Sequence, residues 1–197
     1  MTSHKSDTSK KQKTRSTVAK KSIRPFKQGA FDGCCSLYSL INAIRSTGFT
    51  LDQEQAQSLA DAVFSGMKAS VVKDLIQHGA GHKRLMRMFR SLNNALKEKF
   101  SHKITISRPF KTGKFNVKTV LKEMTNERET DGGIIVRMSS EDFDHYSVFD
   151  YADGEKLRFI DSDHMPNMSV KDVSTNRKKD YKLHLKNVYF LRIKRAA

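Results

Sequence analysis

Residues 28–44 read Gln-Gly-Ala-Phe-Asp-Gly-Cys-Cys-Ser-Leu-Tyr-Ser-Leu-Ile-Asn-Ala-Ile and contain both cysteines of the chain, Cys34 and Cys35. The cysteines follow a glycine-containing turn and precede apolar residues at positions i, i+3, i+4 and i+7, a spacing that predicts a helix over 34–46, ended by Gly48. A cysteine at a helix N-terminus lies in the positive end of the helix dipole, which favours the thiolate. The stretch therefore fits a nucleophilic cysteine, or two small residues that begin a buried helix.

The composition is that of one basic domain. The chain has 197 residues, 37% of them hydrophobic, and a formal net charge of +16. This length fits a single domain, and the charge favours a polyanion or an acidic protein surface as partner. Because two adjacent cysteines cannot readily bridge each other and no third exists, we expect a reducing, cytoplasmic compartment. No apolar run approaches about 18 residues, so we expect no membrane partner.

Residues 1–24 form a separate basic region. They carry eight lysines or arginines against a single acid, Asp7, and show no apolar periodicity. Such a segment cannot bury enough apolar surface to offset the entropy lost on ordering, so we predict a disordered tail. It is a candidate for binding acidic or nucleic-acid partners, for localisation, or simply for solubility. Pro25 marks the predicted start of a folded domain over residues 25–197.

The hydrophobic period changes from helical to strand-like along this domain. After the first helix, the sequence predicts helices at 51–64, 71–77, 83–99 and 117–125. Candidate caps precede three of them, namely Thr50, Ser70 and Asn116. Short β-branched and aromatic runs predict strands at 103–106, 133–138, 146–151, 156–160 and 188–193. Helices followed by an antiparallel sheet describe an α+β domain of two packed layers.

The predicted helix over 83–99 is both basic and amphipathic. Its apolar residues fall on one face, and Lys83, Arg87 and Arg90 fall on another. These cations form either a solvated face over a core stripe or a surface that binds acidic groups.

A hairpin over residues 145–163 is the second informative stretch. A two-residue loop would mix apolar and charged side chains on both faces of the hairpin. A three-residue loop, with Gly154 in the left-handed conformation of a bulged turn, pairs Phe149 with Leu157 and buries both with Phe159. We therefore predict the three-residue loop.

The predicted register places an imidazole opposite a carboxylate. It pairs His145 with Asp161 at the open end of the hairpin, and Asp163, which has the same face parity, is the alternative partner. An aspartate in this position can fix the tautomer and orientation of a histidine, which is the role of the third member of a catalytic triad.

Two separate elements thus supply the parts needed for acyl transfer. That chemistry requires a nucleophile, a base that becomes the general acid, and donors for the oxyanion. The candidates are a cysteine at the helix start, His145 oriented by Asp161, and as donors the backbone N–H of the nucleophile and the side-chain amide of Gln28. A lone histidine at a strand start is more often structural, so the prediction rests on their joint occurrence.

The sequence resembles the papain-like cysteine peptidase superfamily at these positions. Cys35-Ser36-Leu37-Tyr38-Ser39 is similar to the nucleophile-helix pattern of Cys, two variable residues, an aromatic and a small residue. Gln28 stands where the family's oxyanion glutamine precedes the cysteine, one residue further away than the usual spacing. His145-Tyr146 followed by Phe159-Ile160-Asp161-Ser162 is similar to the bacterial C39-like branch, where the catalytic His begins one strand and the Asp ends the next.

A second likeness bears on which cysteine is the nucleophile. Asp32-Gly33-Cys34-Cys35 is similar to the Asp-Gly-x-Cys of ovarian-tumour-type deubiquitinases, but the residues after Cys35 depart from that pattern. The spacing from Gln28 suits Cys34, whereas the aromatic-small pattern suits Cys35. We choose Cys35, because helix geometry constrains more than a loop that can absorb an insertion, and Cys34 stays open as the alternative.

The resemblance implies a papain-like thiol hydrolase that cleaves peptide or isopeptide bonds in a protein or peptide substrate. Cys35 would attack, His145 would serve as base and then acid, Asp161 would orient it, and Gln28 would stabilise the oxyanion. Two alternatives are a transglutaminase-like acyltransferase and a non-catalytic basic module that binds nucleic acid. We expect no cofactor, because the chain has no Gly-Lys-Ser/Thr phosphate loop, and no metal, because it has no Cys-x-x-Cys.

Overall fold

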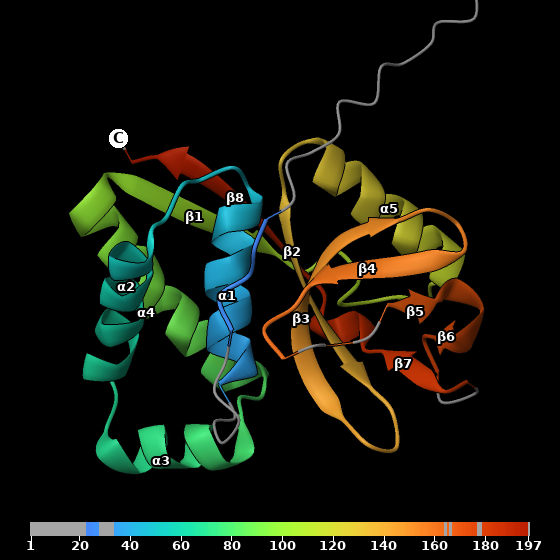
Figure 1. Cartoon of the computed structure of the whole chain (residues 1–197), viewed down its shortest axis with the longest axis horizontal. Helices are drawn as coiled ribbons and strands as arrows, with labels where there is room; N and C mark the ends of the chain where they lie inside the picture. Colours follow the sequence, from blue (N-terminus) through green and yellow to red (C-terminus); the bar gives the residue numbers. More distant parts are fainter. Residues whose placement is uncertain (1–22, 28–33, 164, 166, 177–178, 197) are drawn as a thin grey trace, which may run out of the picture.

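The computed structural model describes residues 23–27, 34–163, 165, 167–176 and 179–196. The fold is α+β, with a helical N-terminal half and an antiparallel sheet in the C-terminal half, as predicted. Most of the predicted tail, residues 1–22, lies outside the described residues, as does the segment 28–33, which includes Gln28. The helix that begins at the cysteines stands between the other N-terminal helices and the sheet (Figure 1).

Five α-helices match the predicted helices and extend several of them. They are α1 Cys35–Ser46, α2 Gln53–Ser65, α3 Ala69–His78, α4 His82–Phe100 and α5 Val117–Glu129. Asn116 caps α5 as predicted, with its side chain accepting from Thr119 N at 2.8 Å. No helix among the described residues combines the length and apolar character needed to cross a bilayer.

The other two predicted caps are wrong. Asp52, and not Thr50, caps α2, because Asp52 and Gln55 form a reciprocal capping box that satisfies two backbone N–H groups. Ser70 lies inside α3, whose N-cap is Lys68 and has no side-chain cap among the described residues.

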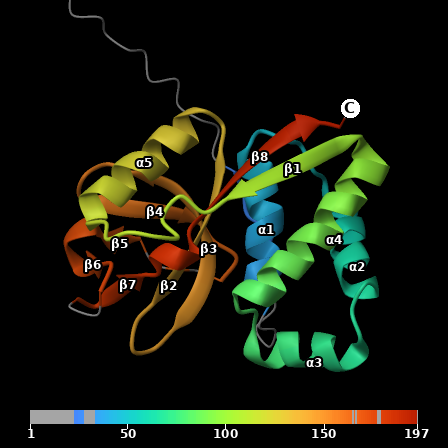
Figure 2. The same cartoon turned by 180° about the vertical axis from the view of Figure 1, so that it is seen from behind.

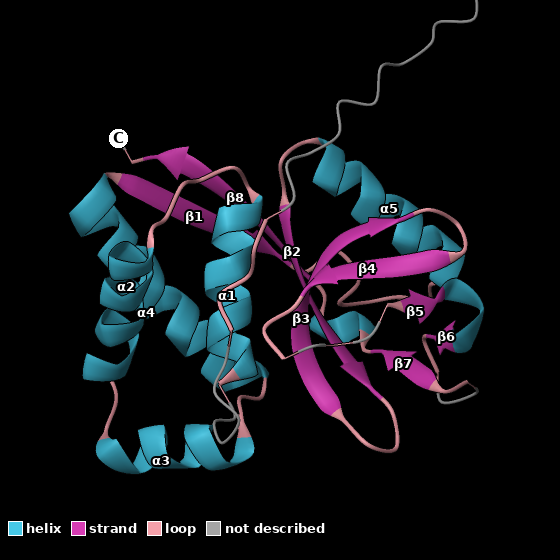
Figure 3. Ribbon diagram, viewed as in Figure 1, coloured by secondary structure: helices cyan, strands magenta, loops and turns pink. Residues whose placement is uncertain are grey.

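The described residues form a sheet of eight strands, which Figure 3 shows in magenta. They are β1 His102–Ser107, β2 Gly133–Ser139, β3 Asp144–Ala152, β4 Lys156–Ile160, β5 Met168–Ser169, β6 Val173–Ser174, β7 Tyr181–Leu183 and β8 Tyr189–Arg195. The main order is β1-β8-β2-β3-β4-β5, and every pairing is antiparallel except that of β6 with β7. Figure 2 shows β1 and β8 extending over α1 and α4 as a two-stranded arm.

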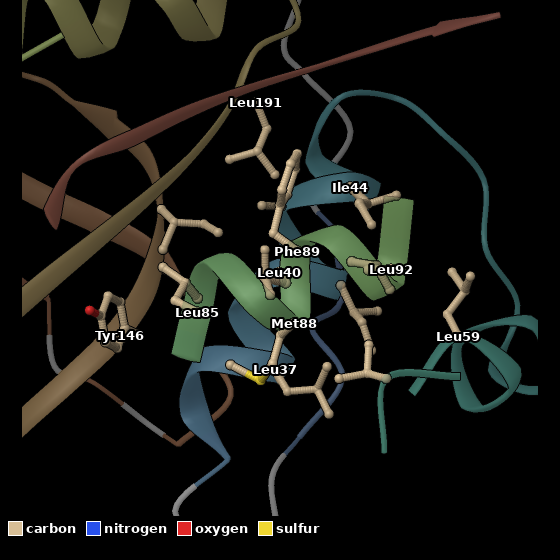
Figure 4. Close-up of a cluster of buried hydrophobic side chains, with 14 of the residues drawn as sticks. Leu37, Leu40, Ile44, Leu59, Leu85, Met88, Phe89, Leu92, Tyr146 and Leu191 are labelled. Carbon is tan, nitrogen blue, oxygen red and sulfur yellow. The ribbon is translucent and has the colours of Figure 1, made fainter. Parts of the chain in front are cut away.

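Two hydrophobic clusters lie on opposite sides of the sheet. The first joins α1, α2 and α4 to the sheet, with Leu40 and Ile44 of α1 packed among leucines of α4 and beside Leu191 of β8 (Figure 4). The second lies under α5 and contains Val120 and Phe149, both fully buried. Burying one such side chain stabilises the fold by about 1.5–3 kcal/mol. Because both faces of the central strands are covered, the sheet holds α1 in a fixed position.

The β3–β4 hairpin has a different register from the predicted one. Phe149 pairs with Phe159 instead of Leu157, and a bulge lies between Phe149 and Tyr151. Ala152 pairs with Leu157, so the turn is longer than the predicted three-residue loop, and the bulge at Asp150 takes one residue back towards the open end. At the bulge Arg128, a buried residue of α5, donates from Nε to the carbonyl of Asp150 and pairs with its carboxylate, both at 3.3 Å. Since the displacement at the open end is two residues, every side chain there keeps its predicted face.

The C-terminal end of α1 touches the sheet through backbone. A Cβ atom added to Gly133 of β2 would lie only 2.4 Å from the carbonyl oxygen of Ala43, so only glycine fits there. Arg128 strengthens the same junction by donating from Nη1 to the carbonyls of Ser46 and Gly132, at 2.7 and 3.0 Å. The far end of α1 is therefore clamped, and its N-terminal end carries the cysteines.

Candidate active site

The two cysteines occupy the N-terminus of α1. Cys34 is the N-cap, and its carbonyl accepts from Leu37 N and Tyr38 N at 2.8 and 3.1 Å. Cys35 is the first residue of the helix, and both cysteines are buried. Within the described residues no side chain caps α1 and no acid lies in its first turn. The first backbone N–H groups of α1 thus present the positive end of the helix dipole beside Cys35.

His145 and Asp161 form a buried ion pair beside this helix end. Nε2 of His145 in β3 lies 2.9 Å from Oδ2 of Asp161, which directly follows β4, and the two side chains are only 12% and 5% exposed. The two residues were predicted to lie opposite each other, and they do make contact, although the strand register that carried the prediction is wrong.

The side chain of Cys35 is the second neighbour that acts on the imidazole of His145, and its effect favours the protonated ring. Because Nε2 is engaged with Asp161, Nδ1 is the ring nitrogen that is left for the sulfur. A buried hydrogen bond from Ser39 Oγ to the carbonyl of Tyr146, 2.8 Å long, holds α1 against β3 one helical turn beyond the cysteine. Helix and strand are therefore locked together where Cys35 and His145 meet.

The neighbours of His145 favour its protonated form. Burial disfavours the imidazolium, but the hydrogen bond and the negative charge of Asp161, together with the interaction with Cys35, outweigh burial and raise the pKa of His145 to about 10. The imidazolium therefore persists at neutral pH, between a sulfur and a carboxylate.

The carboxylate of Asp161 is fixed by the loop that follows β4. Its Oδ1 accepts from the backbone N–H groups of Asp163 and Met165, both at 2.8 Å. Burial opposes ionisation, but the hydrogen bond and the charge of His145, helped by the bond from Met165 N, lower the pKa of Asp161 to about 2. Of the two candidate aspartates, Asp161 is thus the one whose carboxylate contacts the imidazole.

The segment 23–27 runs along α1 and ends at this cluster. Asn42, fully buried in α1, accepts from Phe26 N at 2.9 Å and donates to the carbonyl of Phe26 at 3.2 Å. Nζ of Lys27 then donates to the carbonyl of Asp161 at 3.2 Å. The last described residue before 28–33 is therefore anchored beside Asp161. The position of Gln28, the next residue in the sequence, lies outside the described residues.

The two cysteines have different surroundings. Whereas Cys35 interacts with His145, Cys34 borders a groove of about 760 Å³ between the 23–27 segment, α1 and α2. The larger apolar residues of its lining are Phe26, Leu37, Tyr38, Ile41, Phe64 and Ile76. A pocket with such a lining suits the apolar side chains of a peptide.

Sequence reasoning missed two residues that support the cluster, Asn42 and Lys27, and it named Ser39 as part of the helix pattern without its bond to β3. Asn42 left a readable signal, because it is an amide among the apolar residues of the α1 stripe, and buried amides need partners. Nothing in the sequence indicated which backbone groups those partners would be. No protein-family model matches the sequence, and neither does any curated protein.

Proposed function

We propose that this protein is a thiol hydrolase of the papain-like class that cleaves peptide or isopeptide bonds, with C39-like peptidases as the nearest branch. The observation that carries the proposal is that one histidine, His145, interacts with Cys35 at a helix N-terminus and contacts the buried carboxylate of Asp161. A helical half that carries the cysteine, packed on an antiparallel sheet that carries the histidine and the aspartate, is also what the resemblance to papain-like peptidases implies.

In the proposed reaction, the Cys35 thiolate attacks the carbonyl carbon of the scissile bond and forms a tetrahedral intermediate. His145, held as an imidazolium, gives its proton to the leaving amine as the C–N bond breaks, which leaves a thioester on Cys35. The neutral His145 then takes a proton from water, which attacks the thioester and releases the acid product and the thiolate. Asp161 keeps the ring oriented in both steps.

The oxyanion needs hydrogen-bond donors that are in place before the reaction. The first backbone N–H groups of α1 supply one, since no side chain among the described residues caps them. The amide of Gln28 remains the proposed second donor, and the anchoring of Lys27 on the carbonyl of Asp161 supports it, because Gln28 is the next residue.

The groove beside Cys34 is the proposed site for part of a peptide substrate. Its apolar lining would hold aliphatic or aromatic side chains of the substrate. A reduced cysteine nucleophile also requires a reducing environment, so the proposal includes a cytoplasmic location.

Alkylation kinetics test the proposed nucleophile. The full-length chain is treated with limiting iodoacetamide at neutral pH, and the modified peptide is mapped by mass spectrometry. We expect Cys35 to react faster than an unperturbed thiol, Cys35→Ala to abolish the fast reaction and His145→Ala to slow it at least tenfold. Cys34→Ala, the matched control, should keep it. If neither cysteine outpaces a free thiol, or if Cys34 carries the fast reaction, the assignment to Cys35 is wrong.

Turnover tests the class of reaction. Denatured casein and a fluorogenic isopeptide substrate are incubated with the protein in the presence and absence of a primary amine. New N-termini that depend on Cys35 support hydrolysis, whereas incorporation of the amine into the substrate would reassign the protein to transglutaminase-like acyl transfer. Loss of Cys35 should reduce turnover by a factor on the order of 10³ or more.

A further inference from the structure

A basic groove lies between the first turns of α4 and the segment that follows β1. It has a volume of about 600 Å³ and is lined by His82, Lys83, Met86, Arg87, Arg90, Ile106, Arg108 and Lys111. Five of these eight residues are lysine or arginine, and none is acidic. The groove therefore concentrates positive charge that was predicted for only one face of α4.

The charges of the groove are not neutralised within the described part of the chain. Lys83, Arg87 and Arg90 have no carboxylate partner there, whereas Arg84 in the same helix pairs with Asp74 of α3. Residues 23–197 also carry 30 basic against 20 acidic side chains. Cations crowded together without counter-charges repel one another, and a bound anion relieves that repulsion.

One guanidinium of the groove is held in position by the protein. Nε of Arg108 donates to the carbonyl of Lys186 at 3.0 Å, and Nη1 lies 3.1 Å from Nε2 of His82. Because a guanidinium only donates, Nε2 of His82 must accept, and its Nδ1 then donates to the hydroxyl of Tyr189 at 2.9 Å. A neutral His82 thus orients Arg108 without adding a carboxylate.

Charge spacing and the absence of Phe, Tyr and Trp from the lining indicate the kind of anion. Lys83, Arg87 and Arg90 follow one face of α4 over about 10 Å, from a rise of ~1.5 Å per residue. Arginine forks match phosphate oxygens, and a row of cations matches a row of phosphates. Proteins that grip single strands also offer aromatic platforms for stacked bases. The described lining contains no Phe, Tyr or Trp, and its one ring, that of His82, is already stacked on Tyr189 and bonded to Arg108.

We propose that this groove binds the phosphate backbone of double-stranded nucleic acid without reading its sequence. The α4 cations contact successive phosphates along one strand, and Arg108 and Lys111 contact them from the opposite side of the groove. This role is independent of the hydrolase chemistry proposed for Cys35, and it gives the basic N-terminal region a common partner with the folded domain.

Fluorescence anisotropy tests the proposal on the full-length chain. Labelled 20-base-pair DNA and RNA duplexes of unrelated sequence are titrated at several salt concentrations. Arg87→Glu/Arg90→Glu should weaken binding to all duplexes by roughly tenfold or more and reduce the slope of log Kobs against log salt by about 2. The matched control, Lys118→Glu/Lys122→Glu, makes the same charge change on α5, which lies on the other side of the molecule (Figure 1). It should weaken binding less than threefold and leave the slope unchanged.

Several outcomes would overturn the proposal. Equal losses in the two variants would show that overall charge, and not the groove, carries binding. Tighter binding of poly-glutamate than of duplex would assign the groove to an acidic protein surface. Tighter binding of single strands than of duplex would show that double-stranded nucleic acid is not the ligand of the groove. Thermal unfolding of both variants, expected within a few degrees of the parent, ensures that the comparison is made between folded proteins.

Discussion

His145 and His82 are the same kind of residue in opposite electrostatic environments. Asp161 and Cys35 both act on His145, and together they raise its pKa to about 10 against the effect of burial. Burial and the nearby cations Arg108 and Lys111 instead lower the pKa of His82. At neutral pH the first histidine carries a proton that it can give away, and the second is a neutral acceptor that orients a guanidinium.

The difference teaches that a histidine acquires its role from neighbours on other elements of the fold. Cys35 acts on His145 from α1 and Asp161 from the loop after β4, and Arg108 reaches His82 from the segment after β1. The two regions are nevertheless linked, because Asn187 Nδ2 donates to the hydroxyls of both Tyr146 and Tyr189, at 3.2 and 3.0 Å.

Replacing Asp161 by Asn removes the charge that distinguishes His145 from His82, so its effect should be the largest. The carboxylate contributes stability above its unfolded pKa of 3.8, and this is lost as pH falls towards 2. The raised pKa of His145 contributes stability that is fully present below pH 6.5, its unfolded pKa, and this stability is lost as pH rises towards 10. The free energy of unfolding of the parent should thus exceed that of the variant most between about pH 4 and 6.5, by on the order of 2 kcal/mol.

Urea unfolding across pH 4–9 measures this difference. Asp163→Asn changes a neighbouring carboxylate in the same loop and serves as the control, with no such pH-dependent gap expected. A gap that stays constant across the range would mean that Asp161 acts on stability through packing and not through the charge of His145.

Tyr189→Phe breaks the link between the two regions. It removes the hydroxyl that accepts from His82 Nδ1 and from Asn187, which should destabilise the fold by about 1–2 kcal/mol. Because His145 does not depend on this hydroxyl, the rate of Cys35 alkylation should stay within twofold of the parent, while duplex binding weakens slightly. Urea unfolding, alkylation and anisotropy read out the three effects, and a large fall in alkylation would instead show that the regions are coupled.

His82→Gln tests the smallest effect. The stability that depends on His82 falls as pH falls, whereas the stability that depends on His145 falls as pH rises. Because the folded protein lowers the pKa of His82, the unfolded chain binds more protons below pH 6.5, and the parent loses stability as pH falls through that range. Glutamine keeps an acceptor for Arg108 but does not titrate. The melting temperature of the parent should therefore fall relative to the variant between pH 7 and 5, and parallel curves would mean that His82 is protonated freely in the fold.

The sequence supplied the helices and the main strands, because long periodic segments bury their apolar faces whatever their partners. The caps of α2 show where such reasoning stops, since Thr50 and Asp52 both have cap-forming side chains. The reciprocal partner, Gln55, was visible in the sequence and would have decided for Asp52. Strands β5, β6 and β7 have two or three residues each, too few to show any period.

The contact between His145 and Asp161 was predicted through a wrong register. The turn is longer than the predicted three residues, and the bulge in β3 lies at Asp150, which Arg128 contacts from α5, a tertiary contact that the hairpin sequence does not contain. The pairing moved by two residues, which preserves the faces, whereas a shift of one would have separated the imidazole from the carboxylate. The basic groove was only half predicted for a similar reason, because Arg108 and Lys111 join α4 through the fold.

The position of the cysteine depends on the glycine at the start of β2, although the two residues do not touch. Gly133 touches the backbone of α1 at Ala43. Cys35 lies at the other end of this helix, about 12 Å further along its axis at ~1.5 Å per residue. Any side chain at position 133 would displace α1 and move its N-terminal end away from the imidazole. In a saturation mutagenesis screen for activity, every substitution of this glycine would therefore reduce activity, although the glycine does not touch substrate. Position 133 would tolerate as few residues as the position of the cysteine.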